Sequence, residues 1–178
     1  MGQLIGNNHH DISGGWLRPP FFVCRNFDAM NPDDTPRQIA IDKIRSSFAR
    51  QSFMQTLGAE LLEVGNGRVR IGFSRDERLL QQHGFLHAGV ATAIVDSACG
   101  YAALSMAPVG SEVLTIEFKS NFLRPASGLT FEAIGEVIKS GKSVMVCEGK
   151  VFEVSPSPRL VATMSATMFV QAVSASHA

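Results

Sequence analysis

The chain has 178 residues, of which 45% are hydrophobic and 18% charged, a length that suits one domain with a substantial core and is short for two. Its 16 basic and 16 acidic side chains leave no net charge to attract nucleic acid or an anionic membrane, so neither is expected among its partners. The three cysteines are far apart and form no C-x-x-C pair, which argues against a disulfide framework. Since no secretory signal pattern opens the sequence, a cytoplasmic location is expected.

The N-terminal part is expected to hold a tail followed by a helix. Residues 1–34 show no persistent period and are expected to be a disordered tail. Thr35-Pro36-Arg37-Gln38 combines an N-cap, a proline at the first helical position and a glutamine at the third, which predicts a helix start. Gly58 is expected to end this segment. Its apolar residues at helical spacing are Ile41, Ile44 and Phe48.

The rest of the chain predicts strands around one long helix. Residues 59–64 and 68–73 flank Gly65-Asn66-Gly67, a turn typical of a hairpin, and Val69, Ile71 and Phe73 share one face of the second strand. A helix is expected over 87–106. Four strands follow at 112–123, 129–140, 143–154 and 160–170. Short turns between strands require antiparallel pairing. The predicted fold class is α+β: one curved antiparallel sheet wrapped around a long central helix, with an additional N-terminal helix, forming a domain over 35–172 before a C-terminal tail at 173–178.

The strand at 112–123 alternates in polarity. Its apolar residues are Leu114, Ile116, Phe118 and Phe122, and the residues between them are Thr115, Glu117, Lys119 and Asn121. This alternation predicts a sheet with one covered face.

One carboxylate lies within an apolar stretch. Residues 88–107 hold a single charge, Asp96, over a length that could cross a bilayer, but the charge is central and the segment is rich in Ala and Gly, which favours a buried core helix. Burying an unpaired carboxylate is costly, so proteins seldom keep one without using it. Asp96 is therefore the first catalytic candidate.

Two sequence blocks, at 83–103 and 115–126, carry a resemblance to a known family. The first reads H-G-x-x-H-A-G-x-x-x-x-x-x-D-x-A-x-G-Y-A-A and the second T-I-E-F-K-S-N-F-L-R-P-A. In this order they resemble the PaaI-type acyl-CoA thioesterases, which have the hotdog fold. The family's H-G-G motif reads His87-Ala88-Gly89 here, so an alanine stands where the family has its first glycine.

The resemblance and the chemistry of thioesters together suggest a catalytic set. Asp96 is expected to act as general base or nucleophile, and the Ala88 amide, at a helix N-terminus, as an oxyanion donor. The resemblance adds the Gln81 side-chain amide as a second donor and Thr115 as a partner of the carboxylate. The residues expected to bind substrate are Gln82, His87 and Gly89, with Arg124, Lys119 and Lys142 for the phosphates of coenzyme A.

Spacing along the helix indicates a shared site. Eight residues of α-helix separate Ala88 from Asp96 by about 12 Å, whereas a base and an oxyanion donor must both lie within about 3–4 Å of one thioester. A homodimer, expected to pair into a dimer of dimers, would bring Gln81 and Ala88 of one chain to Asp96 and Thr115 of the other.

Several alternatives stay open at this stage. The small residues on the helix face of Asp96 either leave room for substrate or let the sheet pack closely, and Phe53, Phe85, Tyr101 and Met106 either line a pocket or belong to the core. No metal is expected, because no third ligand has suitable spacing to His83 and His87. No cofactor is expected either, since coenzyme A belongs to the substrate. The leading function is hydrolysis of an aryl or medium-chain acyl-CoA; the alternatives are a hotdog enoyl-CoA hydratase or dehydratase and a non-catalytic acyl-CoA binding or sensing module.

Overall fold

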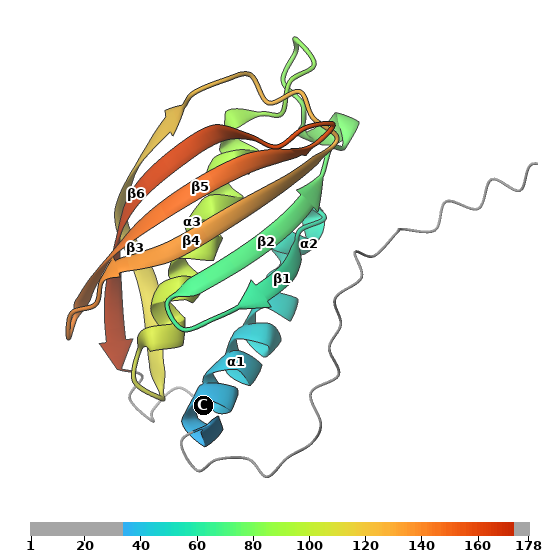
Figure 1. The fold of residues 1–178 in the computed structure, drawn as a ribbon. Coiled ribbons are helices and arrows are strands. Elements are labelled where there is room, and N and C mark those ends of the chain that lie inside the picture. The colour runs from blue at the N-terminus through green and yellow to red at the C-terminus, as the bar shows by residue number, and fades with distance from the viewer. Residues whose placement is uncertain (1–33, 173–178) are drawn as a thin grey trace, which may run out of the picture. The chain divides into compact units, whose positions relative to one another are not determined.

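The computed structural model describes residues 34–172 (Figure 1). The tails predicted for 1–34 and 173–178 lie, apart from Asp34, outside the described residues. In chain order the elements are α1 (Asp34–Ala49), α2 (Ser52–Thr56), β1 (Glu60–Val64), β2 (Arg68–Ser74), a short 3-10 helix (Glu77–Leu79), α3 (Ala88–Met106), β3 (Ser111–Phe122), β4 (Thr130–Lys139), β5 (Val144–Ser155) and β6 (Arg159–Ala172).

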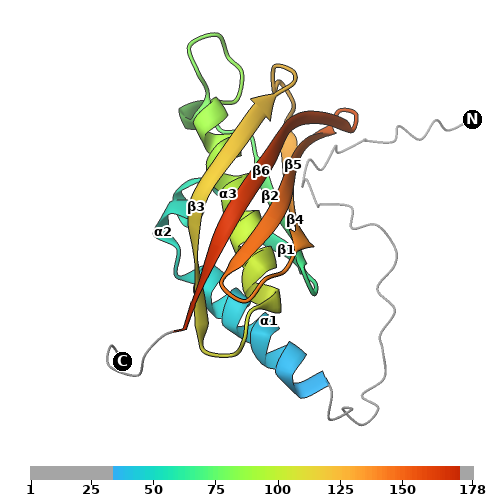
Figure 2. The ribbon, with the colours of Figure 1, turned by 90° about the vertical axis from the view of Figure 1, so that its left-hand side faces the viewer.

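All six strands form one antiparallel sheet in the order β1-β2-β4-β5-β6-β3. The sheet curves around α3, which lies along its inner face (Figures 1 and 2). The expected α+β fold, with its long central helix and additional N-terminal helix, is thus confirmed. The strands after α3 do not form a simple meander, however, because β3 pairs with β6 at one edge of the sheet. Residues 123–129 then lead the chain to β4 in the interior.

The long apolar helix is a core element. By length and composition α3 could cross a membrane, but 56% of its most apolar window is buried within the fold. Its close packing depends on Gly135 of β4, where an added Cβ would lie 2.3 Å from the Ala98 carbonyl carbon. The small residues of α3 therefore serve packing at Ala98 and Ala103, both fully buried, while Gly100 borders a pocket described below.

The N-terminal helix is shorter than predicted. The continuous helix expected up to Gly58 is interrupted at Gln51, whose extended backbone (φ −74°, ψ 97°) starts the separate helix α2. Gly58 itself adopts a left-handed φ of +62°, as expected for a residue that ends a helix. Ile44 and Phe48 of α1 are buried, and the Phe48 ring packs on Tyr101 of α3 with ring centroids 5.8 Å apart.

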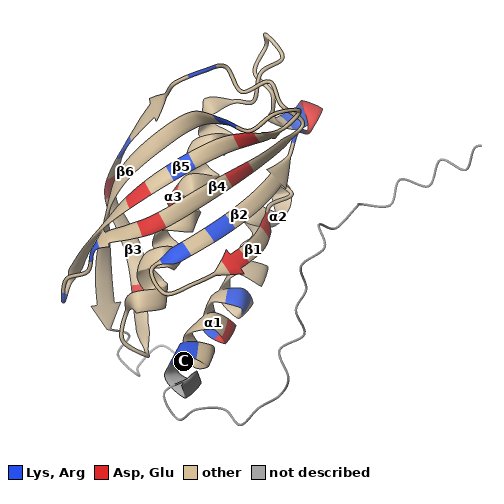
Figure 3. Ribbon diagram, viewed as in Figure 1, with Lys and Arg blue, Asp and Glu red and all other residues tan. Residues whose placement is uncertain are grey.

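The two faces of the sheet differ in polarity. Val69, Ile71 and Phe73 share the inner face of β2 and are buried, as predicted. Charged positions of both signs run along β2, β4 and β5 (Figure 3), where the Arg70 guanidinium bonds the Glu132 carboxylate in two places, at 2.5 and 2.7 Å. Charge pairs of this kind suit a solvated outer face.

Strand β3 departs from the expected alternation. A β-bulge lies between Thr115 and Glu117, so the residues on either side of it change face. Thr115 pairs with the buried Met168, and Phe118 with the buried Ala166. The single apolar face predicted for this strand is therefore wrong, because Leu114 and Phe118 lie on opposite faces. Among the described residues its apolar side chains are only partly covered: Leu114, Ile116, Phe118 and Phe122 are 57%, 58%, 47% and 52% exposed.

Candidate active site

The start of α3 presents an unused backbone donor. His87 is the N-cap, and its Nδ1 accepts a hydrogen bond from the Gly89 amide at 2.9 Å. The Val90 amide donates to the His87 carbonyl oxygen. The Ala88 amide has no hydrogen-bond partner among the described residues, and Ala88 is exposed. It therefore combines a free N–H with the partial positive charge of a helix N-terminus.

Two turns further along α3, Asp96 meets Thr115. The Thr115 hydroxyl donates to Asp96 Oδ1 at 2.9 Å. The bulge in β3 makes this contact, because without it the period of two would turn Thr115 to the same face as Glu117. The structure thus brings together the acid and the hydroxyl that the sequence paired by resemblance alone.

The environment of Asp96 alters its acidity. Partial burial raises the pKa of the Asp96 carboxyl above its ordinary value, and the hydrogen bond from Thr115 offsets part of that rise. No cationic side chain pairs with this carboxylate among the described residues. Its hydrogen-bond donor is the neutral Thr115 hydroxyl. Without a cation beside it, the carboxylate stays basic enough to accept a proton.

Asp96 and Thr115 border the first of two hollows, which we call the acid pocket. It has a volume of about 310 Å³ and lies between α1, α3 and the start of β3. Its wall on the α1 side is polar, because the Tyr101 hydroxyl accepts a hydrogen bond from Gln51 Nε2 at 2.8 Å and lies 3.2 Å from the Ser47 hydroxyl. The polar residues of its lining include Ser47, Gln51, Asp96, Tyr101 and Thr115.

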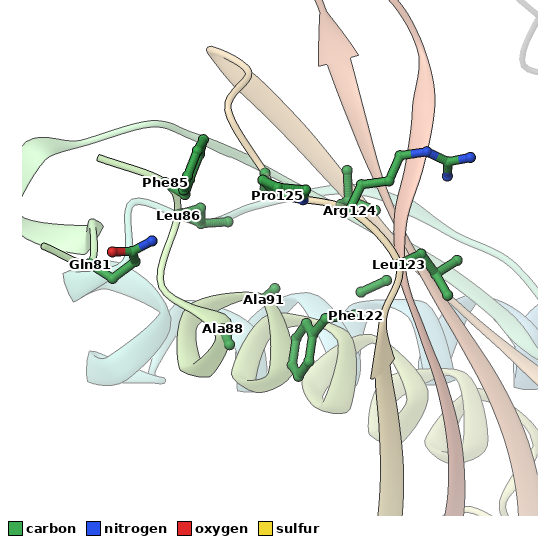
Figure 4. Close-up of a pocket in the computed structure, with 12 residues that line it drawn as sticks. Gln81, Phe85, Leu86, Ala88, Ala91, Phe122, Leu123, Arg124 and Pro125 are labelled. Carbon is green, nitrogen blue, oxygen red and sulfur yellow. The ribbon is translucent and has the colours of Figure 1, made fainter. Parts of the chain in front are cut away.

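The second hollow, the donor pocket, lies at the other end of α3 (Figure 4). It has a volume of about 400 Å³ and a mostly apolar wall, and its lining includes Gln81, Phe85, Ala88, Phe122, Arg124 and Pro125. The Gln81 side chain points toward the hollow in Figure 4. Its Oε1 accepts from the His83 amide, whereas its Nε2 has no partner among the described residues and is free to donate.

The donors and the acid lie in different pockets of one chain. Gln81 and Ala88 border the donor pocket, and Asp96 and Thr115 border the acid pocket. Since Ala88 and Asp96 lie on one uninterrupted helix, the rise of 1.5 Å per residue separates them by about 12 Å. A single chain therefore holds two half-sites, each with one part of the expected constellation.

The other predicted substrate-binding residues are scattered. Gln82 is exposed and borders neither pocket. Arg124 is at the rim of the donor pocket, with its guanidinium pointing away from the hollow and donating to the Leu160 carbonyl oxygen at 2.7 Å (Figure 4). Lys119 is exposed in the middle of β3, and Lys142 is in the turn between β4 and β5, next to the strand end that holds Val170. The three cations do not form one cluster.

Several polar residues around these pockets could not be predicted from the sequence. Ser47 and Gln51 reach the acid pocket only because α1 packs on α3, a contact that no local pattern signals. The sequence left open whether four large side chains line a pocket or belong to the core. Phe85 and Tyr101 border the two pockets described here, while Phe53 and Met106 do not.

A buried ion pair behind the donor pocket was also missed. Glu153 is 1% exposed; burial alone would raise its pKa, but hydrogen bonds from Arg159 and from the Ser127 and Gly128 amides hold the pKa of the carboxyl below its ordinary value. A side chain at Gly128 would collide with Glu153. The loop at 123–129 is therefore fixed to β5 at its far end.

Comparisons with known proteins agree with this geometry. Residues 83–157 match the family model described as "Thioesterase superfamily". The structure is similar to that of a thioesterase family protein from Silicibacter pomeroyi, with 44% identity, a TM-score of 0.74, and coverage of 75% of this chain and 99% of the other. It is also similar to the E. coli PaaI protein, at 18% identity and a TM-score of 0.69 over 78% and 96% of the two chains.

A relative with a named reaction is also similar to this chain. The 1,4-dihydroxy-2-naphthoyl-CoA hydrolase of Listeria monocytogenes is 28% identical over 97 residues, which are 54% of this chain and 79% of that protein. The fold, the two motif blocks and the 44% identity to a protein of the family that this chain covers almost completely lead to one assignment. The chain belongs to the thioesterase superfamily and is a thioester hydrolase with the hotdog fold, the fold that it shares with the PaaI protein.

Proposed function

We propose that the protein hydrolyses an acyl-CoA in a site completed by two copies of the chain, with Asp96 and Thr115 from one and Gln81 and Ala88 from the other. The observation that carries this proposal is the division of the catalytic groups between two pockets about 12 Å apart along α3. Neither pocket alone holds both an acid and an oxyanion donor. A reacting thioester needs both within about 3–4 Å.

The exposed strand β3 supports the pairing of two chains. It lies at the edge of the sheet, so its outer backbone groups have no strand partner within residues 34–172, and its apolar side chains are about half exposed. Two β3 strands that pair antiparallel around a two-fold axis place the start of one beside the end of the other. Thr115 is near the start and Phe122 is at the end. This arrangement joins the acid pocket of each chain to the donor pocket of its partner.

The proposed chemistry follows from the groups that meet in the joined site. The Asp96 carboxylate takes a proton from water, and the water oxygen attacks the thioester carbonyl carbon. The Ala88 amide and Gln81 Nε2 donate to the developing oxyanion. When the intermediate collapses, the C–S bond breaks and the thiolate of coenzyme A takes the proton from Asp96. In the alternative route Asp96 attacks the carbonyl carbon directly and forms an anhydride, which water then hydrolyses.

The two pockets differ in the part of the substrate that they suit. Arg124 gives the donor pocket a cation at its rim for the phosphates of coenzyme A, with apolar walls for the pantetheine arm. The acyl group would then enter the acid pocket. Of the aryl and medium-chain acyl groups considered, the polar wall formed by Ser47, Gln51 and Tyr101 favours an acyl group that carries a hydrogen-bonding substituent.

The arrangement of the histidines does not favour the hydratase alternative. That chemistry requires a histidine near the carboxylate, whereas His87 caps α3 and neither His83 nor His87 borders the acid pocket. The proposal further places the enzyme in the cytoplasm, in keeping with the free thiols of Cys99 and Cys147. It also includes a dimer of dimers as the assembled form.

A thiol-release assay on a panel of aryl and medium-chain acyl-CoAs tests the function. We expect hydrolysis by the native protein and a loss of at least about 100-fold in kcat for Asp96→Asn. Asp42→Asn, which changes an exposed carboxylate on α1, is the matched control and should retain native activity. Binding of acyl-CoA without thiol release would point to a sensing module, and hydration of an enoyl-CoA without thiol release to a hydratase.

A further inference from the structure

Arg75 lies behind the donor pocket and touches both chain segments that form it. Its Nη2 donates to the Gly84 carbonyl oxygen at 2.7 Å, and its Nη1 donates to the Ser127 carbonyl oxygen at 3.4 Å. Gly84 belongs to the turn between Gln81 and Ala88. Ser127 belongs to the loop at 123–129, which provides the opposite wall of the pocket.

Backbone hydrogen bonds near Arg75 join the loop at 123–129 to the same two parts of the chain. The Arg75 amide donates to the Leu129 carbonyl oxygen at 2.8 Å, and the Leu86 amide donates to the Ala126 carbonyl oxygen at 2.9 Å. The loop at 123–129 is itself anchored by the buried carboxylate of Glu153. A series of contacts thus leads from a fixed point in β5, through the loop and Arg75, to the turn that carries both proposed oxyanion donors.

Arg75 supports the tip of this turn, whereas other contacts hold its ends. Between the short 3-10 helix and α3, residues 80–87 form no regular helix or strand, and Gly84 has a positive φ of +81°. The backbone hydrogen bonds that tie this turn to its surroundings lie at its two ends, where the Leu86 amide donates to the Ala126 carbonyl oxygen and the His87 amide to the Leu79 carbonyl oxygen. Nearer the tip, the Gln81 and Gly84 amides donate only to carbonyl oxygens within the turn. The planar guanidinium is suited to bridge two carbonyl groups at once, which a lysine cannot do in the same geometry.

We infer that Arg75 is a positioning residue for thioester hydrolysis, which holds the turn at 80–87 so that the Ala88 amide and the Gln81 side chain point at one oxyanion. This inference rests on the proposed function of those two donors. Arg75 acts through the turn and does not border the donor pocket. Since oxyanion donors act only when they are aligned with the developing charge, loosening the turn lowers the rate of the chemical step more than substrate binding.

The test compares Arg75→Gln and Arg75→Lys with Arg78→Gln. Arg78 is three residues away, is 80% exposed in its side chain and pairs only with Asp76, so it is the matched control. We expect kcat of Arg75→Gln to fall about 10- to 100-fold with KM changed less than about threefold. Arg75→Lys should recover part of that loss, and Arg78→Gln should leave both constants unchanged.

A second measurement needs no activity and separates this inference from the proposed function. Amide hydrogen exchange should accelerate in Arg75→Gln within 80–88 and 123–129, while β4 and β5 retain native protection. The inference is overturned if kcat stays native, if KM alone rises, or if exchange accelerates evenly over the whole domain. If the native protein hydrolyses no thioester, the proposed function fails, and the exchange data still decide whether Arg75 fixes the turn.

Discussion

The contact between Thr115 and Asp96 gives a quantitative prediction for the pH dependence of hydrolysis. Burial raises the pKa of the Asp96 carboxyl, and the hydrogen bond from Thr115 lowers it again in part. Thr115→Val keeps the shape of the side chain but removes the donor. The ionised form of Asp96 then loses stabilisation, so the pKa of this carboxyl should rise further.

The size of the expected rise in the Asp96 pKa follows from the strength of the hydrogen bond that Thr115 donates. A hydrogen bond to a charged group contributes about 1.5–3 kcal/mol, and one pKa unit corresponds to about 1.4 kcal/mol. Because Thr115 is exposed in the isolated chain, water replaces part of the lost interaction, and we expect a rise of about one unit. Asp96 must be ionised to act as base or nucleophile, so activity is lost as the pH falls through its pKa.

The assay is kcat/KM for one acyl-CoA measured from acidic to neutral pH. The acid limb of the profile should move to higher pH by about one unit in Thr115→Val. Thr167→Val is the matched control, because the Thr167 hydroxyl also donates to a carboxylate, that of Glu117, at 3.1 Å on the outer part of the sheet. An acid limb that stays in place in Thr115→Val, or moves to lower pH, would refute the assignment of Asp96 as the ionising group.

Three further predictions follow from burial and charge. Asp96→Asn should lower kcat at least about 100-fold yet raise Tm at neutral pH by about 1–3 °C in a thermal scan, because a carboxyl whose folded-state pKa is raised favours unfolding once ionised. An unchanged or lower Tm would show that the ionisation of Asp96 does not destabilise the fold. Phe118→Lys should yield inactive monomers in sedimentation velocity, whereas Val144→Lys, on a strand with partners on both sides, should leave the assembly intact; an active monomer would contradict the shared site. Glu153→Gln should lower the free energy of unfolding by about 1–3 kcal/mol in urea titrations at neutral pH. The native contribution of Glu153 is present above the unfolded-state pKa and is lost as the pH falls through the lower folded-state pKa, so native and variant stabilities should converge in acid, and a constant difference would count against the ion pair.

Much of the fold could be predicted because local patterns agreed with one another. The alternation in β2 identified its buried face, and the glycine turn at 65–67 identified the first hairpin. The sheet order could not be predicted, because the pairing of β3 with β6 depends on contacts far apart in sequence. The bulge in β3 was equally invisible: one extra residue moves Thr115 to the face of Asp96, and nothing in the alternation of Leu114 to Phe122 indicates it.

The same holds for the candidate site, where some residues carry a local signal in the sequence and others do not. Asp96 stood out because a charge in an apolar helix is unusual, and the Ala88 amide followed from the position of a helix start. Arg75 and Glu153 left no such signal. An arginine and a glutamate on strand ends are common surface residues, and only the tertiary structure shows that they meet the backbone of the loops around the donor pocket.

Mixing two variants of low activity tests the shared site most directly. Asp96→Asn and Gln81→Ala, each weakly active alone, are unfolded together and refolded so that their chains associate at random. Half of the dimers then contain one chain of each kind, and each of these dimers has one site with both Asp96 and Gln81 intact. The account predicts recovery of about a quarter of the native thiol-release activity. Activity no greater than the mean of the two variants would contradict it, because a site contained within one chain cannot be restored by its partner.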